Sequence, residues 1–157
     1  YCENHFFRDL AKPVLDTDST AKKKMRGKIR GLRAIEREVL DAQQANASPQ
    51  APSSNDRDKT SPLAGESGDV VLDYCSVVRG ILNDNHGGPY HPAGLRMLEA
   101  IADVQESLNR VALSGKVGPA FDLLERLKGF IDRGVADQQE AFTRVRMYTD
   151  QVRQVMD

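Results

Sequence analysis

The chain lacks tryptophan, has only 6% aromatic residues, and contains no apolar run near the roughly 20 residues that cross a bilayer. Its two cysteines, Cys2 and Cys75, lie far apart, which excludes a disulfide framework and indicates a reducing, cytoplasmic setting. A Gly-Lys-Ser/Thr nucleotide-binding pattern and a Gly-x-Ser-x-Gly nucleophile elbow are both absent. The chain also starts without methionine. We therefore expect part of a longer polypeptide, with no membrane partner.

Acidic residues are missing from one short stretch near the N-terminus. Residues 22–33 hold seven Lys/Arg in twelve positions and no Asp or Glu, although the whole chain has a net charge of −1. Residues 1–42 carry ten Lys/Arg against seven Asp/Glu, whereas residues 69–157 carry ten against thirteen. The local charge, rather than the net charge, is therefore the guide to partners.

Large aliphatic residues are scarce between positions 43 and 68, where Leu63 stands among three prolines and many small polar residues. Such a composition cannot offset the entropy cost of ordering the backbone. We predict a flexible linker over 43–68. It divides the chain into an N-terminal segment, 1–42, and a helical module, 69–157.

Elsewhere, apolar residues recur at steps of three and four, which predicts an all-α fold. Pro13 is expected to interrupt the first segment. A helix over 20–44 follows it, with an apolar stripe formed by Met25, Ile29, Leu32, Ile35 or Glu36, and Val39 with Leu40. The later module is predicted to be a small antiparallel bundle of four helices. These span 69–83, 93–113, 119–133 and 135–156, with Gly134 ending the third of them.

The basic helix is the strongest functional signal in the chain. Each Lys or Arg that contacts a phosphate displaces counterions, so a cationic helix face is typical of salt-sensitive DNA binding with little sequence preference. The alternative interpretation is a solvated helix face. The candidate DNA-binding residues are Lys22, Lys23, Lys24, Arg26, Lys28, Arg30, Arg33 and Arg37.

Other chemistry-bearing residues give weaker signals. Cys2-x-x-His5 supplies two metal ligands, and a zinc site would need two more, for which His86 and His91 are distant candidates. A packed cysteine beside a hydrogen-bonded histidine is the simpler interpretation. Cys75 lies among valines and leucines and is expected in the core rather than as a nucleophile. The polar loop over 83–94 is interpreted as an interhelical connection, with a binding loop as the alternative.

Three stretches together resemble bacterial DDE-type transposases of the Mutator-related kind: the Cys2-x-x-His5 segment over 1–13, the basic helix through Gly31-Leu32-Arg33-Ala34-Ile35-Glu36-Arg37, and residues 74–80. In that superfamily a Cys-x-x-His motif follows the second catalytic Asp of an RNase H-like core, and a helical insertion precedes the catalytic Glu. Of the family's functional residues, Cys2 and His5 alone carry over to this chain.

The resemblance implies a full enzyme that uses two divalent metal ions, with Mg²⁺ as the expected metal, for phosphodiester transfer. The two catalytic Asp would precede Tyr1, so this chain is expected to be a non-catalytic helical portion with no cofactor of its own. Its expected partner is double-stranded DNA, with self-association left open. The alternative is a helical protein–protein interaction module whose basic helix meets an acidic partner or solvent.

Overall fold

The computed structural model describes residues 3–47, 63 and 65–156, and within these ranges it contains five α-helices and no β-strand. This confirms the all-α prediction. The helices are α1 (Glu3–Lys28), α2 (Leu32–Ala47), α3 (Glu66–Asn83), α4 (Ala93–Leu113) and α5 (Pro119–Met156). None of these described helices combines the length and apolar content that crossing a bilayer requires.

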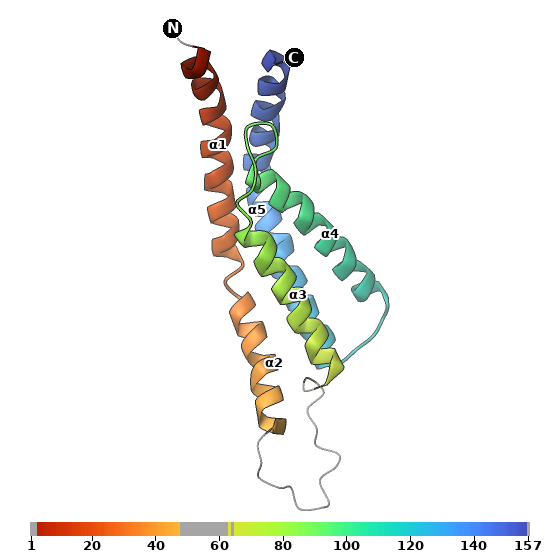
Figure 1. The fold of residues 1–157 in the computed structure, drawn as a ribbon. Helices are drawn as coiled ribbons and strands as arrows, with labels where there is room; N and C mark the ends of the chain where they lie inside the picture. The colour runs from red at the N-terminus through yellow and green to blue at the C-terminus, as the bar shows by residue number, and fades with distance from the viewer. Residues whose placement is uncertain (1–2, 48–62, 64, 157) are drawn as a thin grey trace, which may run out of the picture.

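The helices form an elongated bundle in which α1 and α5 lie side by side in opposite directions (Figure 1). The start of α1 and the end of α5 therefore lie at the same end of the molecule. The second helix, α2, continues in the general direction of α1 (Figure 1), α4 packs against both α5 and α1, and α3 packs against α2, α4 and α5. One hydrophobic cluster contains buried residues from all five helices, so the segments before and after residues 48–62 share a core.

The apolar stripe predicted for the basic segment is confirmed except at Leu40, which is 45% exposed. Met25, Ile29, Leu32, Ile35 and Val39 are all at most 5% exposed and belong to the core. Their steps of three and four keep them on one side of α1 and α2, which packs inward. The opposite side is left to charged residues.

The expected interruption at Pro13 is wrong, because Pro13 lies inside α1. A proline within a helix removes one backbone hydrogen bond and costs about 3 kcal/mol. The neighbouring Val14 is fully buried, and Ala21 and Met25 follow it into the core. Packing of this face offsets the local cost and keeps the helix continuous.

The expected single helix over 20–44 is also wrong, because the chain turns at residues 29–31 between α1 and α2. Tighter turns replace helical bonds there: Ile29 N donates to Arg26 O at 3.3 Å, and Leu32 N donates to Ile29 O at 3.2 Å. Gly31 makes room at this turn for the ring of Phe130, which lies 2.6 Å from where a Cβ would be. The close approach of α5 therefore requires a glycine.

Replacing Gly31 with alanine is expected to lower the free energy of unfolding by about 1–3 kcal/mol, because the added methyl group overlaps the Phe130 ring. Gly27 provides the matched control, since a Cβ there would meet no atom within 4 Å. Gly27→Ala is expected to stabilise α1 by about 0.5–1 kcal/mol. Urea unfolding followed by circular dichroism measures both. Equal effects of the two substitutions would contradict the packing at Gly31.

The predicted helix end at Gly134 is wrong, since α5 runs unbroken through this residue and four expected helices become three. Gly134 is buried where α1 crosses, and a Cβ there would lie 3.7 Å from Lys28 Cβ. The cost of a helical glycine, about 1 kcal/mol, is offset by burial of Ile131 and Phe142 on either side of it.

The predicted linker is shorter than 43–68, because α2 continues to Ala47 and α3 begins at Glu66. Gln43 Nε2 donates to Asp69 Oδ1 at 2.8 Å, which joins these two ends. Leu63 packs against the core. The remaining predicted linker residues, 48–62 and 64, lie outside the described residues.

Candidate nucleic-acid interface

Two of the eight predicted DNA-binding residues, Lys22 and Arg26, bind the end of α3. Lys22 Nζ donates to the backbone carbonyl of Asp84 and, at 2.7 Å, to Asn85 Oδ1. Arg26 Nε donates to Leu82 O at 2.6 Å. These acceptors lie where helix carbonyls have no intrahelical partner and the helix dipole favours cations. Both residues therefore hold α1 against α3.

Lys22 is only 5% exposed, so its ammonium group is poorly placed for an outside partner. Burial, together with the nearby charge of Arg26, lowers the pKa of Lys22, while Asp84 and Asp18 oppose the shift. Hydrogen bonds from this ammonium group to oxygen acceptors offset the free-energy cost of burying its charge.

A third predicted residue, Lys28, connects α1 to α5. Its Nζ lies 3.1 Å from Asp137 Oδ2, and both side chains are about half exposed. An exposed pair of this kind contributes at most about 1 kcal/mol and is weakened by salt. Lys28 therefore stays accessible, with its charge partly offset.

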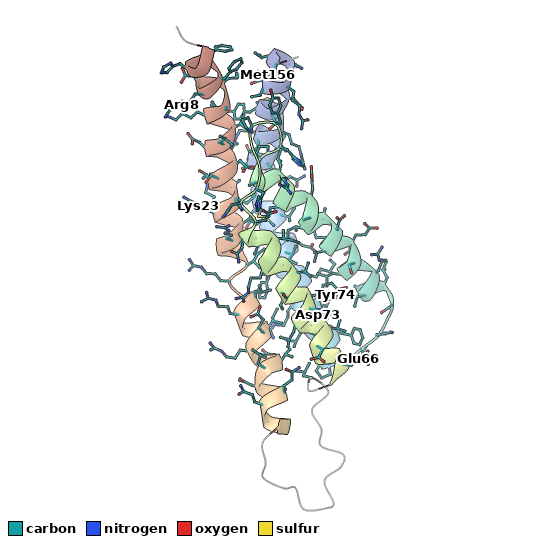
Figure 2. All side chains as sticks on the ribbon, viewed as in Figure 1. Arg8, Lys23, Glu66, Asp73, Tyr74 and Met156 are labelled. Atoms are coloured by element: carbon teal, nitrogen blue, oxygen red, sulfur yellow. The ribbon has the colours of Figure 1, made fainter. Side chains whose placement is uncertain are left out.

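The other five predicted residues are exposed and make no hydrogen bond or ion pair with the described part of the chain. They are Lys23, Lys24, Arg30, Arg33 and Arg37. Lys23 points away from the bundle on the outer side of α1, as does Arg8 further up the same helix (Figure 2). Lys24 instead lies on the flank of α1 near α5, in a hollow that it shares with Gln138 and Arg144. The cations are therefore divided between two flanks.

Sequence reasoning missed Arg8 and Lys12, which are also exposed on α1. The prediction stopped the helix at Pro13 and so detached them from the basic segment. A continuous α1 places Arg8, Lys12 and Lys23 within about 60° of each other around the helix axis, at about 100° per residue. Asp16 interrupts this row near its middle.

A third missed residue is Arg79, on α3. With Arg26, Arg30 and Arg33 it lines an open hollow of about 510 Å³ at the α1–α2 turn. Arg79 Nη2 contacts both carboxylate oxygens of Glu36, at 2.8 Å and 2.7 Å. Three of these arginines belong to the predicted basic segment, and the fold alone brings Arg79 of α3 beside them.

The structure does not test whether Cys2 and His5 could bind a metal together, because Cys2 lies outside the described residues. His5 is exposed on α1. His86 and His91 have carboxylate neighbours, with His86 Nδ1 at 2.6 Å from Asp84 Oδ1 and His91 Nε2 at 2.9 Å from Glu99 Oε2. No group of three or more His, Cys, Asp or Glu side chains within the described ranges is arranged to hold a metal ion.

The 83–94 loop connects α3 and α4, in agreement with its interpretation as an interhelical connection. Gly88 and His91 exchange backbone hydrogen bonds of 3.2 Å in both directions. Backbone and ring hydrogen bonds from His86 lower the pKa of Asp84, whose carboxylate anchors the start of the loop. Arg153 from α5 donates to Tyr90 O at 2.6 Å. These contacts account for the polar composition of the loop.

Cys75 is a core residue, as predicted. It is fully buried on α3, and burial raises the pKa of its thiol to about 11. A thiol with this pKa is almost entirely protonated at neutral pH and is a poor nucleophile. Cys75 therefore offers no catalytic function.

Comparison with known protein families, with curated proteins and with solved structures finds no match for this chain. The transposase resemblance stays a prediction from the sequence. The cationic surface of α1 and α2 is therefore the feature of the molecule from which we infer a function.

Proposed function

We propose that the chain is the non-catalytic helical portion of a DNA transposase and binds double-stranded DNA through the outer side of α1 and α2. The cationic surface of Lys23, Arg30, Arg33 and Arg37 carries this proposal, because these side chains are exposed and have no partner among the described residues. The resemblance at the Cys-x-x-His segment and the basic helix supplies the transposase assignment. Self-association on DNA belongs to the same proposal.

The geometry suits a phosphate backbone. Arg33 and Arg37 lie one turn of α2 apart, about 6 Å at the helical rise of about 1.5 Å per residue, and Lys23 on α1 and Arg30 in the turn precede them. Residues in such a row can contact several successive phosphates without reading bases. The core stripe of Met25, Ile29 and Ile35 holds the two helices rigidly on the bundle, so the cations keep their spacing.

The proposal predicts salt-dependent binding of the chain to a duplex. Each phosphate contact contributes about −0.9 to the slope of log K against log salt. Alanine at Lys23, Arg30 and Arg33 together is expected to reduce this slope by about 3 and to weaken binding roughly tenfold or more. Fluorescence anisotropy of a labelled duplex over a salt series measures both quantities.

The matched control removes three cations elsewhere, by alanine at Arg110, Lys116 and Arg146. These residues are exposed and lie outside α1 and α2. The control is expected to retain most of the affinity and the original slope. Equal losses in both triple variants, or no duplex binding by the unmodified chain at low salt, would contradict the proposal.

One observation favours the alternative, a helical protein–protein interaction module. An open, mainly apolar groove of about 500 Å³ lies between α3 and α4. Val70 and Val77 line it and are 42% and 52% exposed. Absence of DNA binding at low salt would leave this second function as the better candidate.

A further inference from the structure

The arginine hollow at the α1–α2 turn brings four arginines around one open space. Arg26 and Arg30 come from the end of α1 and the turn, Arg33 from α2, and Arg79 from α3. Ile29 and Leu32 form part of its wall and are nearly fully buried, which anchors the turn. The hollow is therefore built on packed backbone from three segments.

The charges in this hollow are only partly neutralised. Glu36 is the single carboxylate that pairs with any of the four arginines within the described residues, and it contacts Arg79. Arg26 is bound to the neutral acceptors Leu82 O and Asn85 Oδ1. Arg30 and Arg33 have neither a hydrogen bond nor an ion pair in the described ranges. The set retains a large positive excess that an anion would relieve.

We infer that the hollow formed by Arg26, Arg30, Arg33 and Arg79 binds a single phosphate group. Arginine forks match the oxygens of a phosphate and bind it through charge-assisted hydrogen bonds. The hollow, at about 510 Å³, has room for the phosphate together with the group that carries it. A backbone phosphate of DNA and the phosphate of a small molecule share this chemistry. The inference goes beyond the proposed function, because a small phosphorylated molecule needs no DNA.

Glu36 sets the affinity of this site. Its carboxylate occupies Arg79 and would repel an incoming phosphate, so binding requires Arg79 to be shared or released. Removing the charge of Glu36 should therefore strengthen binding, whereas removing an arginine should weaken it. Opposite effects from two neighbouring residues on α2 are a specific signature of this site.

The test is a titration of the full chain with inorganic phosphate at constant ionic strength, followed by backbone amide chemical shifts. We expect saturable shifts confined to residues near 29–33 and 79–83. Arg33→Ala is expected to weaken binding roughly tenfold, and Glu36→Gln to strengthen it several-fold, as for charge-assisted hydrogen bonds. Glu38→Gln is the matched control, because Glu38 is also on α2 but pairs with Arg126 at 2.8 Å, outside the hollow. It is expected to change nothing.

A parallel titration with duplex DNA distinguishes the sources of phosphate. Saturable binding of inorganic phosphate without duplex binding would support the site and contradict the proposed function. Duplex binding without phosphate-induced shifts near 29–33 and 79–83 would overturn the site and leave the proposed function intact. Equal gains from Glu36→Gln and Glu38→Gln would also overturn it, because general electrostatics would then explain both.

Discussion

Replacing Phe142 with alanine is expected to lower the free energy of unfolding by about 3–5 kcal/mol. Phe142 is fully buried on α5 and belongs to the core cluster that includes Val14 and Met25 of α1. Loss of its ring removes apolar contacts and leaves a cavity that the surrounding helices fill only in part. For a domain with a total stability of about 5–15 kcal/mol, this is a large fraction.

Urea unfolding measures the loss, and hydrogen exchange shows where it acts. We expect faster exchange in α1 as well as in α5, because the two helices pack along each other. Met147→Ala on the same helix is the control, since Met147 is 50% exposed and should change stability little. Unchanged protection in α1 would contradict the packing of α1 on α5.

The packing of α1 on α5 matters for function because it fixes which side chains of the basic segment face solvent. A detached cationic helix would lose conformational freedom on binding a phosphate backbone, which reduces affinity. A helix fixed by its apolar stripe presents Lys23, Arg30 and Arg33 at set positions. The fold therefore supports a pre-organised cationic surface.

Periodicity predicted much of the fold from the sequence. The stripe from Met25 to Val39 and the bounds of α4 were correct, because spacing reports directly which side of a helix is buried. The errors fall at Pro13, Gly31 and Gly134, where tertiary packing decides the outcome. Pro13 and Gly134 stay helical because buried neighbours offset their cost, whereas Gly31 lies in the turn between α1 and α2, where the Phe130 ring occupies the space of a side chain.

The candidate site was predictable only as a list of basic residues. The sequence does not distinguish Lys22, which is buried against the end of α3, from Lys23, which is exposed one position later. That difference follows from the rotation of α1 relative to the bundle. Arg79 could not be predicted either, since it lies on another helix and enters the site through the fold.

The structural role of the basic run and the anion binding that we propose for it follow from the same electrostatics. The ends of helices expose carbonyl groups and carry partial negative charge, so they attract cations from neighbouring segments. Lys22 and Arg26 meet this requirement at the end of α3 and fix the position of the turn after α1. The cations that remain are then free to serve an external anion.

The largest polar effect is expected at Asp18, a buried acid of α1 that caps another helix. Its Oδ2 accepts a hydrogen bond from Gly94 N at 2.8 Å, and its Oδ1 accepts one from Leu95 N at 3.1 Å. The residue before α4, Pro92, makes no side-chain cap, so Asp18 supplies it from α1. A Cβ at Gly94 would lie 2.5 Å from Asp18 Oδ1, so this contact depends on the glycine.

Asp18→Ala is expected to lower the free energy of unfolding by about 2–4 kcal/mol, because two buried N–H groups lose their acceptors. Asp18→Asn keeps one acceptor oxygen and is expected to lose less. Urea unfolding at neutral pH ranks the three proteins. An alanine variant as stable as the unmodified chain would contradict the capping role.

The same residue makes stability depend on pH in a defined direction. Burial raises the pKa of Asp18 above its ordinary 3.8, and the two backbone hydrogen bonds and Lys22 offset this only in part. Between pH 3.8 and the raised pKa of Asp18 in the folded chain, the folded chain binds more protons than the unfolded chain. The contribution of Asp18 to the free energy of unfolding therefore falls as pH rises through this range. The free energy of unfolding of the unmodified chain minus that of Asp18→Asn should accordingly be highest below pH 3.8 and should decline above it. A difference that instead grew with pH would show that the hydrogen bonds to Gly94 and Leu95, rather than burial, dominate the charge state of Asp18.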